Sequence, residues 1–179
     1  MAFDSTARET ESAAESTARL GRLGRSAAFG PELALAIDLA HQAGRIQMAR
    51  YERLEAIRAK GPRDVVTEVD NLCEDLVRLA VGERYPSDSF YAEEIGEVPH
   101  TGATSSGRVW IVDPLDGTVN YANGIPFFCI SIALVADGRP VLGVVYDPTR
   151  DETFAGAIDG PSLRNGQAIE VGQLSLIHI

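Results

Sequence analysis

The hydrophobic positions of the first half of the chain follow helical spacing. From residue 31 onward, apolar residues recur at steps of three and four, which is the spacing of one helix face. That face comprises Leu33, Ile37, Ala40, Gly44, Met48 and Tyr51. A second helix is predicted over Asn71–Arg84, ending before Pro86. Its expected inward residues are Leu72, Leu76, Leu79 and Ala80.

Beyond Pro126 the spacing becomes that of strands. Three strands are predicted, over residues 128–135, 140–146 and 152–158, separated by the turn-forming segments 137–138 and 147–150. Links this short force neighbouring strands to run antiparallel. Helices first and a meander later predict an α+β layered fold rather than a parallel βαβ repeat.

Residues 1–30 differ from the rest because they contain hardly any large apolar side chains. Such a segment cannot bury enough surface to offset its ordering entropy, so a disordered N-terminal extension is predicted. Residues 31–179 are then expected to form one folded unit, and a hydrophobic content of 45% supplies a core.

The formal net charge of −10 narrows the possible partners. An acidic body argues against binding nucleic acid or an anionic membrane through a basic surface. No apolar run is long enough to span a bilayer, and the N-terminus lacks the apolar core of a signal peptide, so a cytoplasmic location is expected. Cys73 and Cys129 each stand among apolar neighbours and are interpreted as buried structural thiols.

The segment 110–118 carries the strongest chemical signal. Asp113 and Asp116 follow a strand-like run and are separated by two residues. Two close carboxylates repel each other when ionised, so proteins that present both usually share a proton between them or bind a cation. Gly117 and Thr118 follow where the chain turns, and their N–H groups suit a phosphate. Metal beside phosphate is the resulting hypothesis.

Two alternatives compete with this interpretation. Asp, Pro and Gly are common turn formers, so the same residues are compatible with an ordinary turn. The aspartyl-nucleophile signature of haloacid dehalogenase-like phosphatases places its carboxylates two residues apart, whereas Asp113 and Asp116 are three apart. A covalent aspartyl-phosphate mechanism is therefore disfavoured.

Further acids follow other short apolar runs. Glu93 and Glu94 come after one such run, and Asp70 closes the segment 64–70. Asp70 alone reads most simply as a helix N-cap, and Glu94 as a solvated group. Lys60, before Gly61-Pro62, would ordinarily be a solvated loop lysine.

Together these segments resemble the inositol monophosphatase family of magnesium-dependent sugar and nucleotide phosphatases. The matching motifs, in the family's order and approximate spacing, are residues 60–70, 93–94, 110–121, 124–127 and 131–133. The resemblance spans residues 31 to 173 and implies an alternating sandwich of helix pairs and sheets. Several ordered motifs are far more specific than any one alone.

The resemblance also implies roles for individual residues. Glu93, Asp113 and the Leu115 carbonyl would hold one Mg²⁺, and Asp113 and Asp116 would contribute to a second. Thr118 and Asp70 would orient and deprotonate the attacking water, with Glu93 nearby. The substrate phosphate would meet Gly117, Thr118 and Asp116. Lys60 and Glu94 would be supporting groups.

Inositol monophosphate is the leading expected substrate, because residues 118–121 look like the inositol phosphatase branch of the family. Histidinol phosphate, or another sugar or nucleotide phosphate, is the rival. Family members form homodimers and continue beyond the point where this sequence stops. We therefore expect a C-terminally truncated domain, and a non-catalytic metal-binding or interaction fragment is the alternative from a different functional class.

Overall fold

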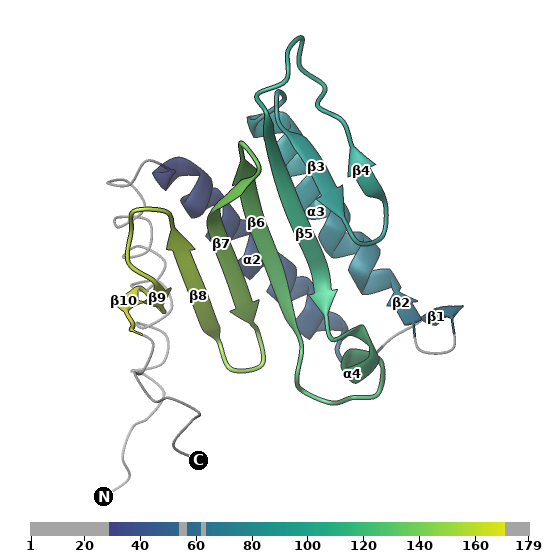
Figure 1. Ribbon diagram of the computed structural model, residues 1–179. Helices are drawn as coiled ribbons and strands as arrows, with labels where there is room; N and C mark the ends of the chain where they lie inside the picture. The colour runs from purple at the N-terminus through teal and green to yellow at the C-terminus, as the bar shows by residue number, and fades with distance from the viewer. Residues whose placement is uncertain (1–28, 54–56, 62–63, 171–179) are drawn as a thin grey trace, which may run out of the picture.

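The computed structural model describes residues 29–53, 57–61 and 64–170. Two long helices lie behind one sheet, and a short helix stands at one end of it (Figure 1). In chain order the elements are α2 Gly30–Arg50, β1 Ile57–Gly61, β2 Asp64–Thr67, α3 Glu68–Arg84, β3 Ser89–Ala92, β4 Gly96–Val98, β5 Arg108–Asp116, α4 Thr118–Ala122, β6 Cys129–Ala136, β7 Arg139–Asp147, β8 Glu152–Ala157, β9 Leu163–Arg164 and β10 Gln167–Ala168. The predicted extension over residues 1–30 lies outside the described residues except for its last two.

The main sheet has the strand order β10-β9-β8-β7-β6-β5-β3-β4. Strands β5 to β8 form an antiparallel meander, as the short links between β6, β7 and β8 predicted. Strand β3 runs parallel to β5, while β4 pairs antiparallel with β3 at the sheet edge. Strands β1 and β2 form a separate hairpin. The mixed α/β architecture matches the predicted fold class.

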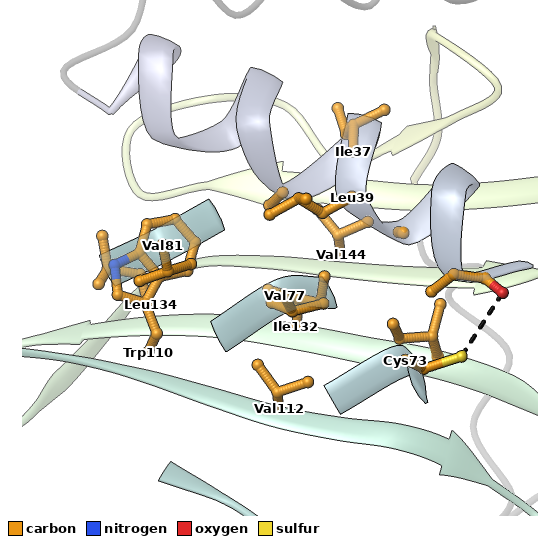
Figure 2. Packing of buried hydrophobic residues seen from close by; sticks show 14 of the residues in the cluster. Ile37, Leu39, Cys73, Val77, Val81, Trp110, Val112, Ile132, Leu134 and Val144 are labelled. Atoms are coloured by element: carbon orange, nitrogen blue, oxygen red, sulfur yellow. Dashed lines mark hydrogen bonds between the residues drawn. The ribbon is translucent and has the colours of Figure 1, made fainter. Parts of the chain in front are cut away.

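One face of the sheet carries the core. Trp110 and Val112 of β5, with Ile132 and Leu134 of β6, are at most 2% exposed and point toward α2 and α3 (Figure 2). Side chains alternate between the two faces of a strand, so their neighbours point the other way. Ile111, for example, is 41% exposed. Among the described residues no helix is long and apolar enough to cross a membrane.

Helix α2 confirms most of the predicted stripe and corrects its end. Leu33, Ile37, Ala40 and Gly44 are buried, and Gly44 lets the Tyr146 ring approach so closely that an added Cβ would stand 2.4 Å from it. Met48, however, is 42% exposed. A polar residue, Gln47, takes the buried position instead.

Helix α3 uses a different face from the one predicted. Its buried positions are Val69, Asp70, Cys73, Glu74, Val77 and Val81. The predicted inward residues Leu72 and Leu79 are 39% and 61% exposed, and Leu76 and Ala80 are half-buried. The buried apolar row of the helix instead consists of Val and Cys side chains at steps of four, so side-chain size alone misplaced the face.

Both cysteines are free thiols. Cys73 is buried as predicted, and its Sγ donates to the carbonyl of Ala43 at 3.6 Å (Figure 2). Cys129 is only half-buried and lies beside Asp116, with 3.7 Å between its Sγ and Oδ2. Burial, chiefly, raises the pKa of each thiol to about 12, so neither is a reactive thiolate at neutral pH.

Candidate functional site

The parallel pairing of β3 and β5 brings two of the predicted acids to the same end of the sheet. Ala92 is the register partner of Val112, so the next residues along the two strands are Glu93 and Asp113. Parallel strands end at the same edge of a sheet. Glu93 and Asp113, twenty positions apart in sequence, are therefore brought to the same end of the sheet, where the charge of Glu93 acts on Asp113.

The end of β5 is irregular where the second aspartate follows. Asp113 pairs with Ser131 and Asp116 with Cys129, with a register shift between them. Pro114 and Leu115 lie in this shift and are buried, whereas Asp116 is exposed. The Leu115 N–H donates to Oδ1 of Asp113 at 3.2 Å. The bulge thus presents both carboxylates from one short stretch of chain.

Gly117 then turns the chain into the five-residue helix α4. Its φ of 93° lies in the left-handed region, and a Cβ there would stand 2.8 Å from the Phe127 carbonyl oxygen. Glycine is the residue that satisfies both conditions. The turn places Thr118 so that its hydroxyl is 2.9 Å from the Leu115 carbonyl and 3.1 Å from Oδ1 of Asp70.

Asp70 reaches the site from the first turn of α3 and is 1% exposed. The helix N-cap is Thr67, not Asp70 as expected from Asp70 alone, and Asp70 completes a capping box with it. The backbone N–H and hydroxyl of Thr67 donate to Oδ2 of Asp70 at 2.8 and 2.6 Å. These bonds occupy Oδ2 and leave Oδ1 to face Thr118.

The clustered acids perturb one another. Burial, with the charges of Glu93, Asp116 and Asp70 added, raises the pKa of Asp113 to about 7. Burial also raises the pKa of Asp70, against the hydrogen bonds from Thr67 and Thr118. A divalent cation would relieve this repulsion, and carboxylate and carbonyl oxygens are the donors that Mg²⁺ prefers. Within the described residues, no three acidic, His or Cys side chains stand close enough to form a ready-made metal cage.

The two predicted supporting residues have different outcomes. The N–H of Glu94 donates to Oε2 of Glu74 at 3.1 Å, so a side chain of α3 holds the turn after β3. Lys60 lies in β1, and its side chain falls outside the described part of the chain.

Glu74 is a residue that sequence reasoning missed. It is 2% exposed, and burial is the largest cause that raises the pKa of its carboxyl. Its position four residues after Asp70 was the available signal, because residues at that spacing share a helix face.

A cavity of about 340 Å³ adjoins the turn. It is lined by polar groups of Asp116, Asn120 and Asp147, and by the rings of Phe127, Phe128 and Phe154. The Asn120 amide donates to the Phe127 carbonyl at 2.9 Å and so braces the turn. The cavity is large enough for a small polar molecule next to the carboxylates.

Comparison with known proteins identifies the family of this chain. The model of the inositol monophosphatase family matches residues 31–178. The chain belongs to this family. The family that the sequence motifs predicted is therefore confirmed, and the solved structures below confirm the predicted fold class.

Individual relatives agree with the family match. Inositol monophosphatase 3 of Solanum lycopersicum is 40% identical over 144 residues, which cover 80% of this chain and 53% of the relative. A histidinol-phosphatase of Chlorobaculum parvum is 32% identical and is covered over 55% of its length, against 81% of this chain. Among solved structures, a Thermotoga maritima IMPase superposes with a TM-score of 0.73 at 31% identity, covering 80% of this chain and 54% of that one. The chain thus spans about half the length of the relatives it matches.

Proposed function

We propose that this chain is the carboxylate-bearing part of a Mg²⁺-dependent phosphomonoesterase that hydrolyses inositol monophosphate. The observation that carries the proposal is the convergence of Glu93, Asp113, Asp116 and the Asp70–Thr118 pair at the end of β5. Three separate segments deliver these groups: the first turn of α3, the turn after β3, and residues 113–118. Membership of the family supports a phosphatase, and the names of its plant relatives favour the inositol substrate.

The donors in this chain fit a hard cation. Glu93, Asp113 and the Leu115 carbonyl would hold one Mg²⁺, and Asp113 with Asp116 would contribute to a second. Burial, with the charges of Glu93 and Asp116 added, raises the pKa of Asp113, and such ions would favour its ionised form. When bound, Mg²⁺ supplies positive charge that favours ionisation of a water molecule and offsets charge on the phosphoryl oxygens.

The protein's own groups would orient and deprotonate the attacking water. The Thr118 hydroxyl oxygen lies 3.1 Å from Oδ1 of Asp70 and 2.9 Å from the Leu115 carbonyl, and its single proton can be donated to either. When that proton points to Asp70, a lone pair of the hydroxyl is left to accept a proton from a water on its open side. The proton Thr118 already carries can move to Asp70, whose pKa is raised and which is buried enough to take it. The N–H groups of Gly117 and Thr118 would bind phosphate oxygens, and no phosphoenzyme is needed.

Histidinol phosphate is the second candidate substrate, and the 32% identical histidinol-phosphatase favours it. A non-catalytic metal-binding or interaction module is the candidate from another class. The chain covers only 53% to 55% of the relatives above, which is the observation that favours the module.

Calorimetric titration with Mg²⁺, paired with phosphate release from inositol 1-phosphate and from histidinol phosphate, tests the proposal. We expect Mg²⁺ uptake and faster release from the inositol ester. Asp113→Asn should abolish both uptake and turnover with the fold intact, while Asp75→Asn, an exposed aspartate of α3, serves as the matched control.

Each result has a distinct meaning. Uptake without turnover supports the module, and faster release from histidinol phosphate supports the rival substrate. Near-parental turnover in Asp113→Asn would remove Asp113 from the mechanism. A cytoplasmic location and a homodimer remain predictions.

A further inference from the structure

The bulge in β5 leaves two buried carbonyls that need partners from outside the sheet. Pro114 and Leu115 lie where the β5–β6 register shifts. The Leu115 carbonyl lies 2.9 Å from the Thr118 hydroxyl, whose single proton is shared between this carbonyl and Asp70. The Pro114 carbonyl accepts from Nε2 of Gln47, on α2, at 2.9 Å. A side chain 67 positions away in sequence thus supplies the hydrogen bond that the strand ladder cannot.

The surroundings of Gln47 fix the orientation of its amide. The side chain is fully buried, and Nε2 faces the carbonyls of both Pro114 and Cys129, the latter at 3.5 Å. Two acceptors can only be met by the NH₂ end of an amide. Gln47 therefore contacts β5 and β6 on both sides of the bulge.

The other end of this amide is costly to the fold. Among the described residues, Oε1 of Gln47 is buried without a hydrogen-bond partner. An unpaired buried acceptor destabilises the folded state, and an apolar side chain of the same size would avoid that cost. A glutamine at this position is therefore explained by the contacts of its Nε2 with the two carbonyls, and not by burial of the side chain as such.

The backbone of the same residue holds the far side of the turn. The Tyr121 hydroxyl, on α4, donates to the Gln47 carbonyl at 2.6 Å, and Tyr121 is 1% exposed. One residue of α2 thus fastens the chain before the turn, at Pro114, and after it, at Tyr121. Asp113, Asp116 and Thr118 lie within this span or next to it.

We propose that Gln47 is a positioning residue for the candidate metal site. By holding the Pro114 carbonyl inward, it fixes the bulge that sets Asp113 and Asp116 relative to each other. The inference rests on the proposed function for its metal, but not for its effect on the bulge. The sequence did not predict the burial of Gln47, because the apolar Met48 beside it was expected to take the inward position.

Gln47→Met tests the proposal, since Met keeps the length of the side chain and removes the donor. Gln42→Met is the matched control, because Gln42 lies on the same helix and its amide donates only to Asp38 of that helix at 2.9 Å. We expect Gln47→Met to weaken Mg²⁺ affinity roughly tenfold by calorimetry, which is the typical effect of losing a group that orients a metal ligand. Hydrogen exchange of the amides of residues 115–118 should accelerate, while Trp110 and Val112 keep parental rates.

A merely structural role gives a different pattern. It would accelerate exchange across the whole sheet and leave the Mg²⁺ dissociation constant unchanged, and that pattern overturns the proposal. If Gln47→Met does not fold, Gln47→Leu replaces it, because leucine also removes the donor and buries no charge at this fully buried position. The same two shifts are expected.

The two proposals fail separately. If the parental chain takes up no Mg²⁺, the proposed function fails, while the exchange rates still decide whether Gln47 holds the bulge. If the parental chain binds Mg²⁺ and Gln47→Met shows parental affinity and parental exchange at residues 115–118, Gln47 has no positioning role.

Discussion

The Thr118 hydroxyl donates a hydrogen bond to Oδ1 of Asp70 at 3.1 Å, and this contact joins the end of β5 to the first turn of α3. Both groups are partly or fully withdrawn from solvent. The pair is the arrangement through which a proton would leave an attacking water. Its chemistry can be tested by removing the hydroxyl without changing the shape of the side chain.

Thr118→Val should lower phosphate release at least 100-fold, the order of magnitude expected when a group that transfers a proton is lost. Valine has the same shape but cannot bond to Asp70 or to the Leu115 carbonyl. Thr118→Ser keeps the hydroxyl and should stay within about tenfold of the parental rate. Thr101→Val, at an exposed threonine, is the control. Equal rates for the Val and Ser variants would exclude Thr118 from proton transfer.

Asp113→Asn should stabilise the metal-free protein at pH 8. In the folded chain the pKa of Asp113 is about 7, well above its ordinary value near 4, so ionisation destabilises the fold. This cost grows as pH rises from about 4 to about 7 and is constant above that. Because Asp113 is only half-buried, solvent screens part of the effect, and a gain of about 1–2 kcal/mol is expected.

Urea unfolding in the presence of EDTA, at pH 5.5 and pH 8, measures this gain. The difference between Asp113→Asn and the parental chain should be larger at pH 8. The exposed Asp75→Asn variant should change the unfolding free energy by less than about 0.5 kcal/mol at both pH values. A loss of stability at pH 8 in Asp113→Asn would show that the carboxylate cluster is not repulsive.

Asp88→Asn should destabilise the fold by about 1–3 kcal/mol, since it removes the charge that accepts from Arg108 and Trp110, while Arg108 keeps its pair with Glu32 at 2.8 Å. The Asp88 side chain is 1% exposed and accepts from Arg108 at 2.8 Å and from Trp110 Nε1 at 2.9 Å. Burial alone would raise the pKa of Asp88, but the hydrogen bonds from Arg108, Ser106 and Trp110 outweigh it and hold that pKa below its usual value.

The sign of this shift predicts the pH dependence. A lowered pKa stabilises the fold fully above the ordinary Asp value, near 4, and that stabilisation is lost as pH falls below it. The difference between Asp88→Asn and the parental chain should therefore shrink in acid-unfolding curves below about pH 4. Arg164→Gln, which removes a surface pair with Glu152, should change stability by less than about 0.5 kcal/mol. An Asp88→Asn variant as stable as this control would contradict the prediction.

The sequence predicted the parts of the fold that depend on local spacing. The antiparallel meander follows from turns too short for any other connection. The matching motifs, three of which carry acids, identify the family because they occur together in order. The position of Glu93 and Asp113 at the same end of the sheet could be expected only from the family. It depends on the parallel pairing of β3 with β5, which no local pattern encodes.

The errors share a physical cause. Leu72 and Leu79 were expected inward because they are large and apolar, yet the buried apolar row of α3 consists of Val and Cys. Glu74 and Gln47 were missed because polar side chains are normally solvated. Their partners are backbone groups of segments 20 and 67 positions away, and backbone groups leave no trace in a sequence.

Gly117→Ala should cost about 2–3 kcal/mol, because it combines a left-handed φ of 93° with a Cβ placed 2.8 Å from the Phe127 carbonyl oxygen. Gly82→Ala is the matched control of opposite sign. Gly82 lies in α3 with no atom within 4 Å of an added Cβ, so alanine should stabilise the helix by up to about 1 kcal/mol. Urea unfolding measures both. Since the turn also places Thr118 against Asp70, the Gly117 variant should lose Mg²⁺ affinity as well; a variant with parental stability and affinity would mean that the turn tolerates a different backbone conformation.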